Sequence, residues 1–193
     1  MKQEVRMKKI FALAITLLSL SIQAKELHDT NLAIHKGIYF EPKAMITFGE
    51  TIKHGDSILK GSTGYGFGLD LGYAFNENFA VEIDGSYSES DVKEILHTGE
   101  SKTAKGSFYT YGANAVLTYP LHNHLIILGK LGLTYEHEDL GSLEIKGLEH
   151  GASWAAGIEY SFNPHIEVSL EYEGADIRSV RGDTLQLGLI YMF

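Results

Sequence analysis

The chain has 193 residues, enough for one domain, and its 16 basic and 25 acidic side chains give a net charge of −9. It has no cysteine, which excludes disulfide bonds, and its acidic balance argues against nucleic-acid binding. Glycine is abundant (21), proline is scarce (3), and tyrosine (11) and phenylalanine (9) are frequent, a composition that suits long, closely spaced strands. A mean hydropathy of −0.06 does not separate a water-soluble protein from a membrane barrel, because half of each barrel strand faces inward.

The first 24 residues have the pattern of a secretory signal peptide. Two lysines precede an apolar run from Ile10 to Leu20, and Ala24 supplies a small residue at the expected cleavage point. The run is shorter than the roughly 20 residues of a transmembrane helix, so we expect export, with Met1 or Met7 as the true start. Cleavage after Ala24 would leave 12 basic and 24 acidic residues, a net charge of −12, and a short periplasmic tail at residues 25–36.

From residue 37 onward, apolar side chains recur at every second position, which is the period of a β-strand. The alternation divides into eight segments, at residues 38–48, 65–75, 79–88, 107–119, 125–136, 152–162, 166–173 and 184–193. Pro42 lies inside the first segment and predicts a local bulge there. Eight strands of this length form a small barrel, so we expect the barrel domain to occupy residues 37–193.

Eleven charged residues fall inside these segments, and all of them lie on the face opposite the apolar stripe. A charge on a lipid-facing position near the middle of a bilayer costs about 2–4 kcal/mol, so this one-sidedness indicates a barrel with lipid outside. Isolated buried charges are unfavourable, and we therefore expect a polar network in the lumen. We expect Lys43 and Lys130 to lie among Glu41, Glu82, Asp84 and Glu171, with Arg178 and Arg181 as further partners. The eleven predicted network residues are Glu41, Lys43, Asp70, Glu82, Asp84, Lys130, Glu136, Glu159, Glu167, Glu171 and Glu173.

The connections between segments alternate between short turns and long polar loops. The turns lie at residues 76–78, 120–124 and 163–165, and the longer loops lie at residues 51–64, 89–105, 137–150 and 174–183. Short periplasmic turns and long outer loops are the arrangement of outer-membrane barrels. An even number of strands then places both ends of the barrel on the periplasmic side.

A water-soluble barrel with the apolar face inside is the alternative architecture. Two features argue against it. The face that would meet water is rich in glycine and alanine, as at Gly66 and Gly68, whereas a narrow lumen requires such small residues. Aromatic residues also mark both ends of the apolar face, such as Phe75 near a short turn and Tyr135 near a long loop, as expected for two interfacial girdles. The sequence predicts an all-β, eight-stranded antiparallel up-and-down transmembrane β-barrel.

Two turns repeat a phrase, at residues 72–82 and again at residues 159–169, and the chain ends on Tyr191-Met-Phe193. With these features the chain resembles the small outer-membrane β-barrel family that includes the OmpA transmembrane domain, OmpX and the opacity-type proteins. The resemblance implies a bacterial outer-membrane location, with membrane lipid and lipopolysaccharide as partners. It also implies that the barrel-assembly machinery reads the terminal strand, with Tyr191 and Phe193 as the assembly signal.

No pattern in the sequence predicts a catalytic or metal-binding site. All nine histidines lie outside the eight segments, and the pair His122 and His124 lacks the cysteine or carboxylate spacing of a metal centre. Nothing resembles a nucleophile with its base, so we expect no enzyme activity, cofactor or metal. Two functions remain: a structural or surface-interaction (adhesin-like) barrel with a polar plugged lumen, whose outer loops contact a host or surface ligand, and a narrow cation-leaning porin.

Overall fold

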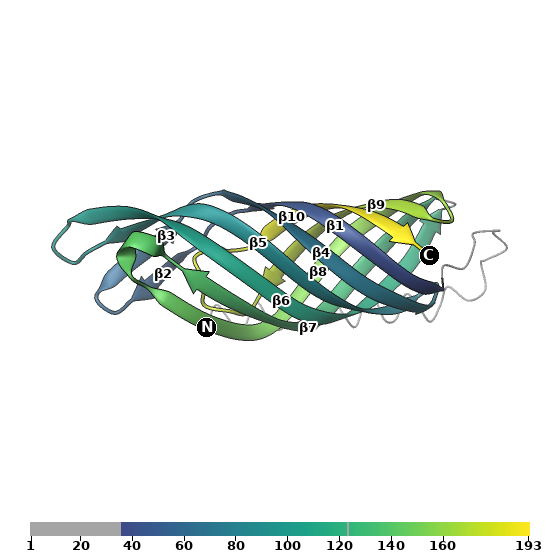
Figure 1. The fold of residues 1–193 in the computed structure, drawn as a ribbon, viewed down its shortest axis with the longest axis horizontal. Helices are drawn as coiled ribbons and strands as arrows, with labels where there is room; N and C mark the ends of the chain where they lie inside the picture. Colours follow the sequence, from purple (N-terminus) through teal and green to yellow (C-terminus); the bar gives the residue numbers. More distant parts are fainter. Residues whose placement is uncertain (1–35, 123) are drawn as a thin grey trace.

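Nearly all of the chain that the computed structural model describes, residues 36–122 and 124–193, is β-strand (Figure 1). The predicted signal peptide and all but the last residue of the predicted tail lie outside these ranges. The strands are β1 Gly37–Thr47, β2 Thr51–His54, β3 Ser57–Gly61, β4 Gly64–Asn76, β5 Phe79–Ile95, β6 Ser101–His122, β7 Leu125–Asp139, β8 Lys146–Asn163, β9 Ile166–Ala175 and β10 Thr184–Met192. In the described ranges no helix is long and apolar enough to cross a membrane.

Eight of these strands close into a ring of antiparallel neighbours. The order β5-β4-β1-β10-β9-β8-β7-β6 is completed by pairing of β5 with β6, so the first and last strands of the chain, β1 and β10, are partners. The short hairpin β2–β3 lies outside the ring and pairs with the outer part of β5. This arrangement confirms the predicted eight-stranded up-and-down barrel. Closure removes the unpaired edge that a strand such as β10 would otherwise expose.

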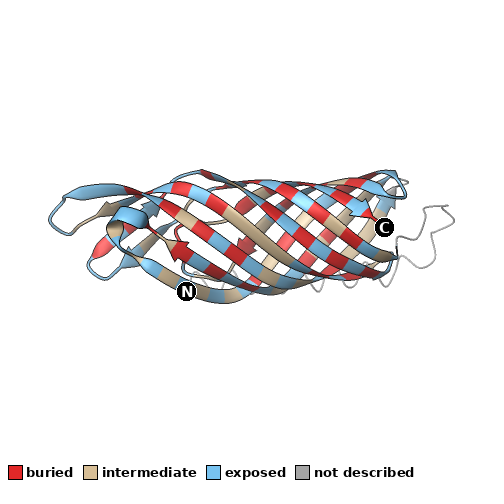
Figure 2. Cartoon of the chain, in the orientation of Figure 1, coloured by how far each residue is buried: buried red, intermediate tan, exposed pale blue. Residues whose placement is uncertain are grey.

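Side chains alternate between the outside and the lumen along every strand of the ring. Figure 2 shows this as a chequered pattern of buried and exposed positions. In β4, for example, Leu69 and Leu71 are exposed, whereas Asp70 and Gly72, which alternate with them, are buried. The exposed side chains form an apolar surface around the barrel, which suits contact with hydrocarbon.

Aromatic side chains form one band at each end of this apolar surface. At the short turns Phe75 stacks on Phe79 with ring centroids 5.5 Å apart. Near the long loops the centroids of Tyr87 and Tyr109 are 4.8 Å apart, and many further rings lie in the same two bands. These bands are the expected girdles, and they mark the two membrane interfaces.

Two of the predicted long loops are largely regular strand. β5 and β6 run past the outer aromatic band as one hairpin, paired up to Ile95 and Ser101, and β2–β3 adds two strands to its edge. Backbone groups beyond the membrane can pair with each other instead of with water, and the alternation of buried and exposed side chains continues there. The result is a four-stranded sheet, β2-β3-β5-β6, that projects from the barrel (Figure 1).

The bulge predicted at Pro42 is absent. Phe40 pairs with Tyr191 and Lys43 with Gly188, which is one continuous register between β1 and β10. Pro42 itself lies opposite Leu69 of β4. Its missing N–H removes a hydrogen bond from the ladder without shifting the strand. The register shifts in the described strands lie instead at the three short turns.

Candidate functional site

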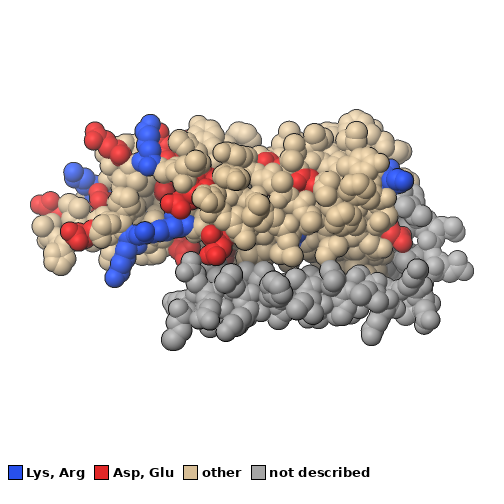
Figure 3. Space-filling model, turned by 90° about the horizontal axis from the view of Figure 1, so that it is seen from below, with Lys and Arg blue, Asp and Glu red and all other residues tan. Residues whose placement is uncertain are grey.

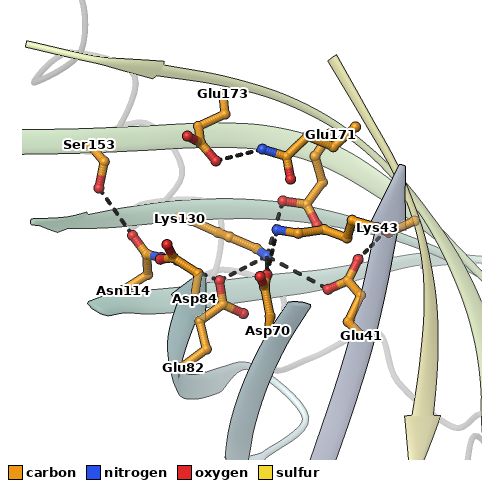
Figure 4. Close-up of polar contacts among 12 residues, drawn as sticks. Glu41, Lys43, Asp70, Glu82, Asp84, Asn114, Lys130, Ser153, Glu171 and Glu173 are labelled. Carbon is orange, nitrogen blue, oxygen red and sulfur yellow. Dashed lines mark hydrogen bonds and ion pairs between the residues drawn. The ribbon is translucent and has the colours of Figure 1, made fainter. Parts of the chain in front are cut away.

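The middle of the lumen contains a network of ion pairs centred on Lys130 of β7 (Figure 4). Its ammonium nitrogen lies 2.9 Å from Glu82 Oε1 and 3.0 Å from Glu171 Oε2. It also lies 3.3 Å from Asp70 Oδ2 and 3.9 Å from Glu41 Oε2. All five side chains are 5% exposed or less, so these charges are screened little by solvent.

Neighbouring strands add further polar contacts to this cluster. Lys43 Nζ lies 2.6 Å from Asp70 Oδ2, and the Tyr39 hydroxyl donates to Glu82 Oε2 at 2.9 Å. Ser169 donates to Glu41. These residues point inward from four strands, β1, β4, β5 and β9, so ring closure brings together groups that are far apart in the sequence.

Glycines on the lumen face make room for these side chains. A Cβ at Gly72 would lie 2.1 Å from the Tyr39 ring, and a Cβ at Gly188 would lie 2.0 Å from Glu41 Oε1. Neither position can therefore carry a larger residue without displacing a member of the network. The glycine-rich alternation in the sequence reflects this packing.

Asp84 and Glu173 lie beside the central cluster and use different partners. Asn114 donates to Asp84 Oδ1 at 2.7 Å, and Gln186 donates to Glu173 Oε2 at 2.6 Å. Both carboxylates are half-buried, nearer the outer end of the lumen. Of the acids expected around Lys43 and Lys130, Asp84 is the one that the structure does not bring into direct contact with either lysine.

A third cation, Arg181, enters the lumen from the loop before β10. Its Nε donates to Glu136 Oε2 at 2.5 Å and its Nη1 to Thr184 Oγ1 at 2.9 Å. Arg181 is buried, whereas Arg178, the other arginine considered from the sequence, is exposed. The excess of acids over lysines in the strands is the signal that pointed to a cation from a loop.

The outer mouth of the barrel is covered by an apolar cluster that the sequence reasoning did not anticipate. It consists of Leu59, Val92, Phe108, Leu140 and Val180, all almost fully buried. These residues come from the outer hairpins, the β7–β8 connection and the loop before β10. The signal for it is the alternation of apolar residues that continues through the predicted loops.

At the opposite end the lumen holds a cavity of about 90 Å³ with mainly apolar walls. The remaining predicted network residues, Glu159 and Glu167, line this cavity and are not part of the Lys130 cluster. The sequence predicted which residues face inward and which face outward. It did not predict that the lumen has a polar zone and a separate apolar zone.

Outside the membrane, one face of the projecting sheet carries lysines from all four of its strands. Lys60 of β3 lies opposite Lys93 of β5, Lys53 of β2 lies opposite Ile58, and Lys105 of β6 lies opposite Asp91. The four lysines are exposed. Figure 3 shows charged side chains gathered at this end of the molecule, while the middle of the barrel surface is mostly uncharged.

Oxygens of Glu41, Asp70 and Glu82 approach within 4.8 Å of one another, as the ligands of a metal ion could. The ammonium of Lys130 lies within 3.9 Å of an oxygen of each of them and places a positive charge in their midst. The lumen chemistry is therefore that of an internally paired ionic network.

A closed ring of eight antiparallel strands, an apolar belt between two aromatic bands and a polar lumen are the features of an outer-membrane barrel. A family model described as "Outer membrane protein beta-barrel domain" matches residues 10–193. The chain belongs to this family.

Solved structures of other outer-membrane barrels have the same fold. OprG from Pseudomonas aeruginosa has a TM-score of 0.67 at 15% identity, covering 82% of this chain and 97% of OprG. Neisserial surface protein A has a TM-score of 0.60 at 14% identity, covering 81% and 97% of the two chains. Ail of Yersinia pestis, solved in complex with the heparin analogue sucrose octasulfate, has a TM-score of 0.51 at 20% identity, covering 82% and 99%.

A comparison with curated protein sequences finds no match. The family match and the structural neighbours confirm the predicted bacterial outer-membrane location and the expected resemblance to small outer-membrane barrels. At these identities the solved structures establish the fold only. The individual activities of OprG, Neisserial surface protein A and Ail are not assigned to this chain.

In this outer-membrane barrel, the predicted assembly residues Tyr191 and Phe193 lie at the end of β10, on the outward face of the barrel wall. Tyr191 is 40% exposed and Phe193 is 72% exposed, and the Phe193 N–H donates to the Ile38 carbonyl at 3.0 Å. The Phe40 ring lies 6.0 Å from both aromatic rings. Both residues are therefore part of the aromatic band at the short turns and next to the seam between β1 and β10.

Proposed function

We propose that this protein is a surface-interaction barrel with a closed lumen, and that the lysine-bearing face of its projecting sheet binds a polyanionic glycan. The observation that carries the proposal is the basic patch, which we define as Lys53, Lys60 and Lys93. These lysines are exposed and make no ion pair with any residue in the described part of the chain. In a protein with a net charge of −9, such a patch is a local exception.

The register of the sheet concentrates the positive charge of the patch. Lys60 and Lys93 lie directly opposite each other on neighbouring strands, which lie roughly 5 Å apart. Like charges in this position destabilise a sheet, and an anionic ligand would relieve that repulsion. The acids of this face, Glu89 and Asp91, lie toward the membrane beside Lys105, which pairs with Glu89 at 3.9 Å.

The surroundings of the patch suit a glycan. Thr51 and Thr103 stand at the two ends of the row that contains Lys60 and Lys93, and both are exposed. Hydroxyl groups beside lysines can hydrogen-bond sugar oxygens while the ammonium groups bind sulfate or phosphate. The heparin analogue bound to Ail supports this ligand class, although the likeness between the two chains extends only to the fold.

Two sources of such a ligand share this chemistry: sulfated glycans of a host surface and the phosphorylated sugars of lipopolysaccharide in the same membrane. Binding of detergent-folded protein to sucrose octasulfate and to lipopolysaccharide would be measured separately by isothermal titration calorimetry. We expect the double variant Lys60→Gln/Lys93→Gln to weaken binding about tenfold, with a steep dependence on salt. The arm that shows this loss identifies the source.

The matched control is Lys102→Gln, which removes one exposed lysine from the opposite face of the same hairpin. Equal weakening by Lys102→Gln would mean that bulk charge rather than the patch attracts the ligand. Failure of both ligands to bind the unaltered protein would overturn the proposed function.

The closed lumen rests on two layers of packing. The Lys130 network fills the middle, and the apolar cluster around Phe108 covers the outer mouth. The second candidate function, a narrow cation-leaning porin, is favoured by the excess of acids over the three cations Lys43, Lys130 and Arg181 in the lumen. Planar-bilayer recording separates the two: we expect no steady conductance steps, whereas persistent cation-selective steps from purified protein would establish the porin.

A catalytic role has no support in the geometry. The rings of His124 and His165 hydrogen-bond to the backbone carbonyls of Ser161 and Met192 at 2.8 Å and 3.0 Å. Neither is placed to activate a side-chain nucleophile. The structural neighbours are likewise outer-membrane proteins, and we infer that this barrel is not an enzyme.

A further inference from the structure

The cavity at the short-turn end of the lumen has apolar walls and one open side. Its walls include Ala74, Ala80 and Val116, and Tyr39 separates it from the Lys130 network. Glu77, from the turn between β4 and β5, lies at its mouth on the periplasmic rim. No lysine or arginine is among the described residues that line it.

Glu159 of β8 gives the cavity a specific chemistry. The residue is 8% exposed, and within the described chain it makes neither an ion pair nor a side-chain hydrogen bond. Glu167 lines the same cavity and places a second carboxyl group close to it. A buried carboxylate without a cation is unfavourable, because burial removes the water that would otherwise stabilise its charge.

We propose that this cavity binds a small organic cation, a primary ammonium group on a short alkyl chain, with the ammonium paired to Glu159. The alkyl chain would lie against the apolar walls, and the carboxylate at Glu77 would favour entry of a cation from the periplasmic side. The internal lysines are engaged elsewhere, because Lys130 and Lys43 contact Asp70 and its neighbouring carboxylates and form no ion pair with Glu159.

The size of the cavity limits the ligand. An apolar cavity of about 150 Å³ holds benzene, so about 90 Å³ accommodates a smaller group, such as an ammonium with its first few carbons. A longer chain could extend through the open mouth. A neutral alcohol of the same length would fill the same walls but leave the Glu159 charge uncompensated.

The test is isothermal titration calorimetry. The folded full barrel, in a non-ionic detergent, is titrated with n-butylammonium chloride. Butan-1-ol and sodium butyrate serve as neutral and anionic probes of the same length. We expect only butylammonium to bind, and Glu159→Gln to weaken that binding about tenfold or more, because truncating one partner of a buried charge pair has at least this effect. Folding of each variant is checked by the difference in gel migration between unheated and boiled samples.

Two further variants distinguish the site from a general charge effect. Glu138→Gln removes a buried acid at the outer end of the barrel, away from the cavity, and should leave binding unchanged. Ala80→Leu would fill the cavity while keeping Glu159, and should abolish binding. Absence of binding by the unaltered protein at millimolar butylammonium, equal binding of butan-1-ol, or full binding by Glu159→Gln would each overturn the proposal.

Discussion

Lys130 is the residue on which the lumen network most directly depends, because its ammonium group contacts four carboxylates. The sequence predicts that this lysine lies on the inward face of its strand among carboxylates, but not which of them it contacts. Its partners come from β1, β4, β5 and β9. Ring closure brings those strands to the same level, and the network is a product of that closure.

Replacing Lys130 with methionine, which keeps the length of the side chain, should destabilise the barrel by about 3–5 kcal/mol, because it leaves buried carboxylates without their cation. The measurement is the free energy of unfolding in urea, in lipid vesicles. Lys102→Met, at an exposed position, is the control and should change stability little. Equal stability of Lys130→Met and the unaltered protein would show that the lumen does not need this charge.

At the scale of elements, the outer hairpins and the terminal strand each have a distinct role. The β5–β6 hairpin and the β2–β3 hairpin build a sheet whose inner face packs over the barrel mouth and whose outer face carries the basic patch. β10 closes the ring against β1 and ends in the aromatic band. The loop-like composition of the outer hairpins concealed their role as a sheet. The alternation of apolar residues in the last strand, in contrast, predicted its role in closing the barrel.

Phe108→Ala should loosen the outer sheet without unfolding the barrel, because Phe108 is the largest member of the apolar cluster at the mouth. Loss of a buried phenylalanine costs about 3–5 kcal/mol where neighbours cannot repack. We expect faster trypsin cleavage in the β5–β6 hairpin, at sites such as Lys93. Tyr109→Ala, one residue along on the outward face, is the control, and identical cleavage of both variants would contradict a role for the cluster.

We propose that Phe193 and Tyr191 are recognised by the barrel-assembly machinery, and deletion of Phe193 should then lower the amount of protein in the outer membrane several-fold. The same deletion should leave detergent refolding nearly intact, because Phe193 is largely exposed and lies outside the network. Membrane yield and refolding yield are measured in parallel. Normal membrane yield would refute the assembly role, and a refolding defect would assign the loss to folding instead.

The whole molecule combines an ionic interior with an apolar exterior. A closed β-barrel has no free edge at which unfolding can begin, so we expect the folded ring to persist in detergent until it is heated. We expect unheated and boiled samples to migrate differently on a denaturing gel. Identical migration, with a β-type circular dichroism spectrum lost at low temperature, would contradict the closed ring.

Much of the fold follows from the sequence because lipid contact constrains each strand separately. A strand with hydrocarbon on one side must alternate, and the alternation from Leu185 to Phe193 can be recognised without knowing its neighbours. The inward placement of residues such as Asp70 and Lys130 was predictable for the same reason. Aromatic positions near the turns then located the two membrane interfaces.

What the tertiary structure alone decided is which inward residues meet. The stagger of neighbouring strands around the ring sets the height of each side chain in the lumen, so Lys43 pairs with Asp70, while Asp84 pairs with Asn114. Folding of the outer segments placed Arg181 rather than Arg178 in the lumen and assembled the cover around Phe108. Glu159 was separated from the lysines and placed in an apolar cavity. A period of two in the sequence specifies the side of the sheet on which a side chain lies. Only closure of the ring specifies how far along the lumen that side chain lies and which side chain it contacts.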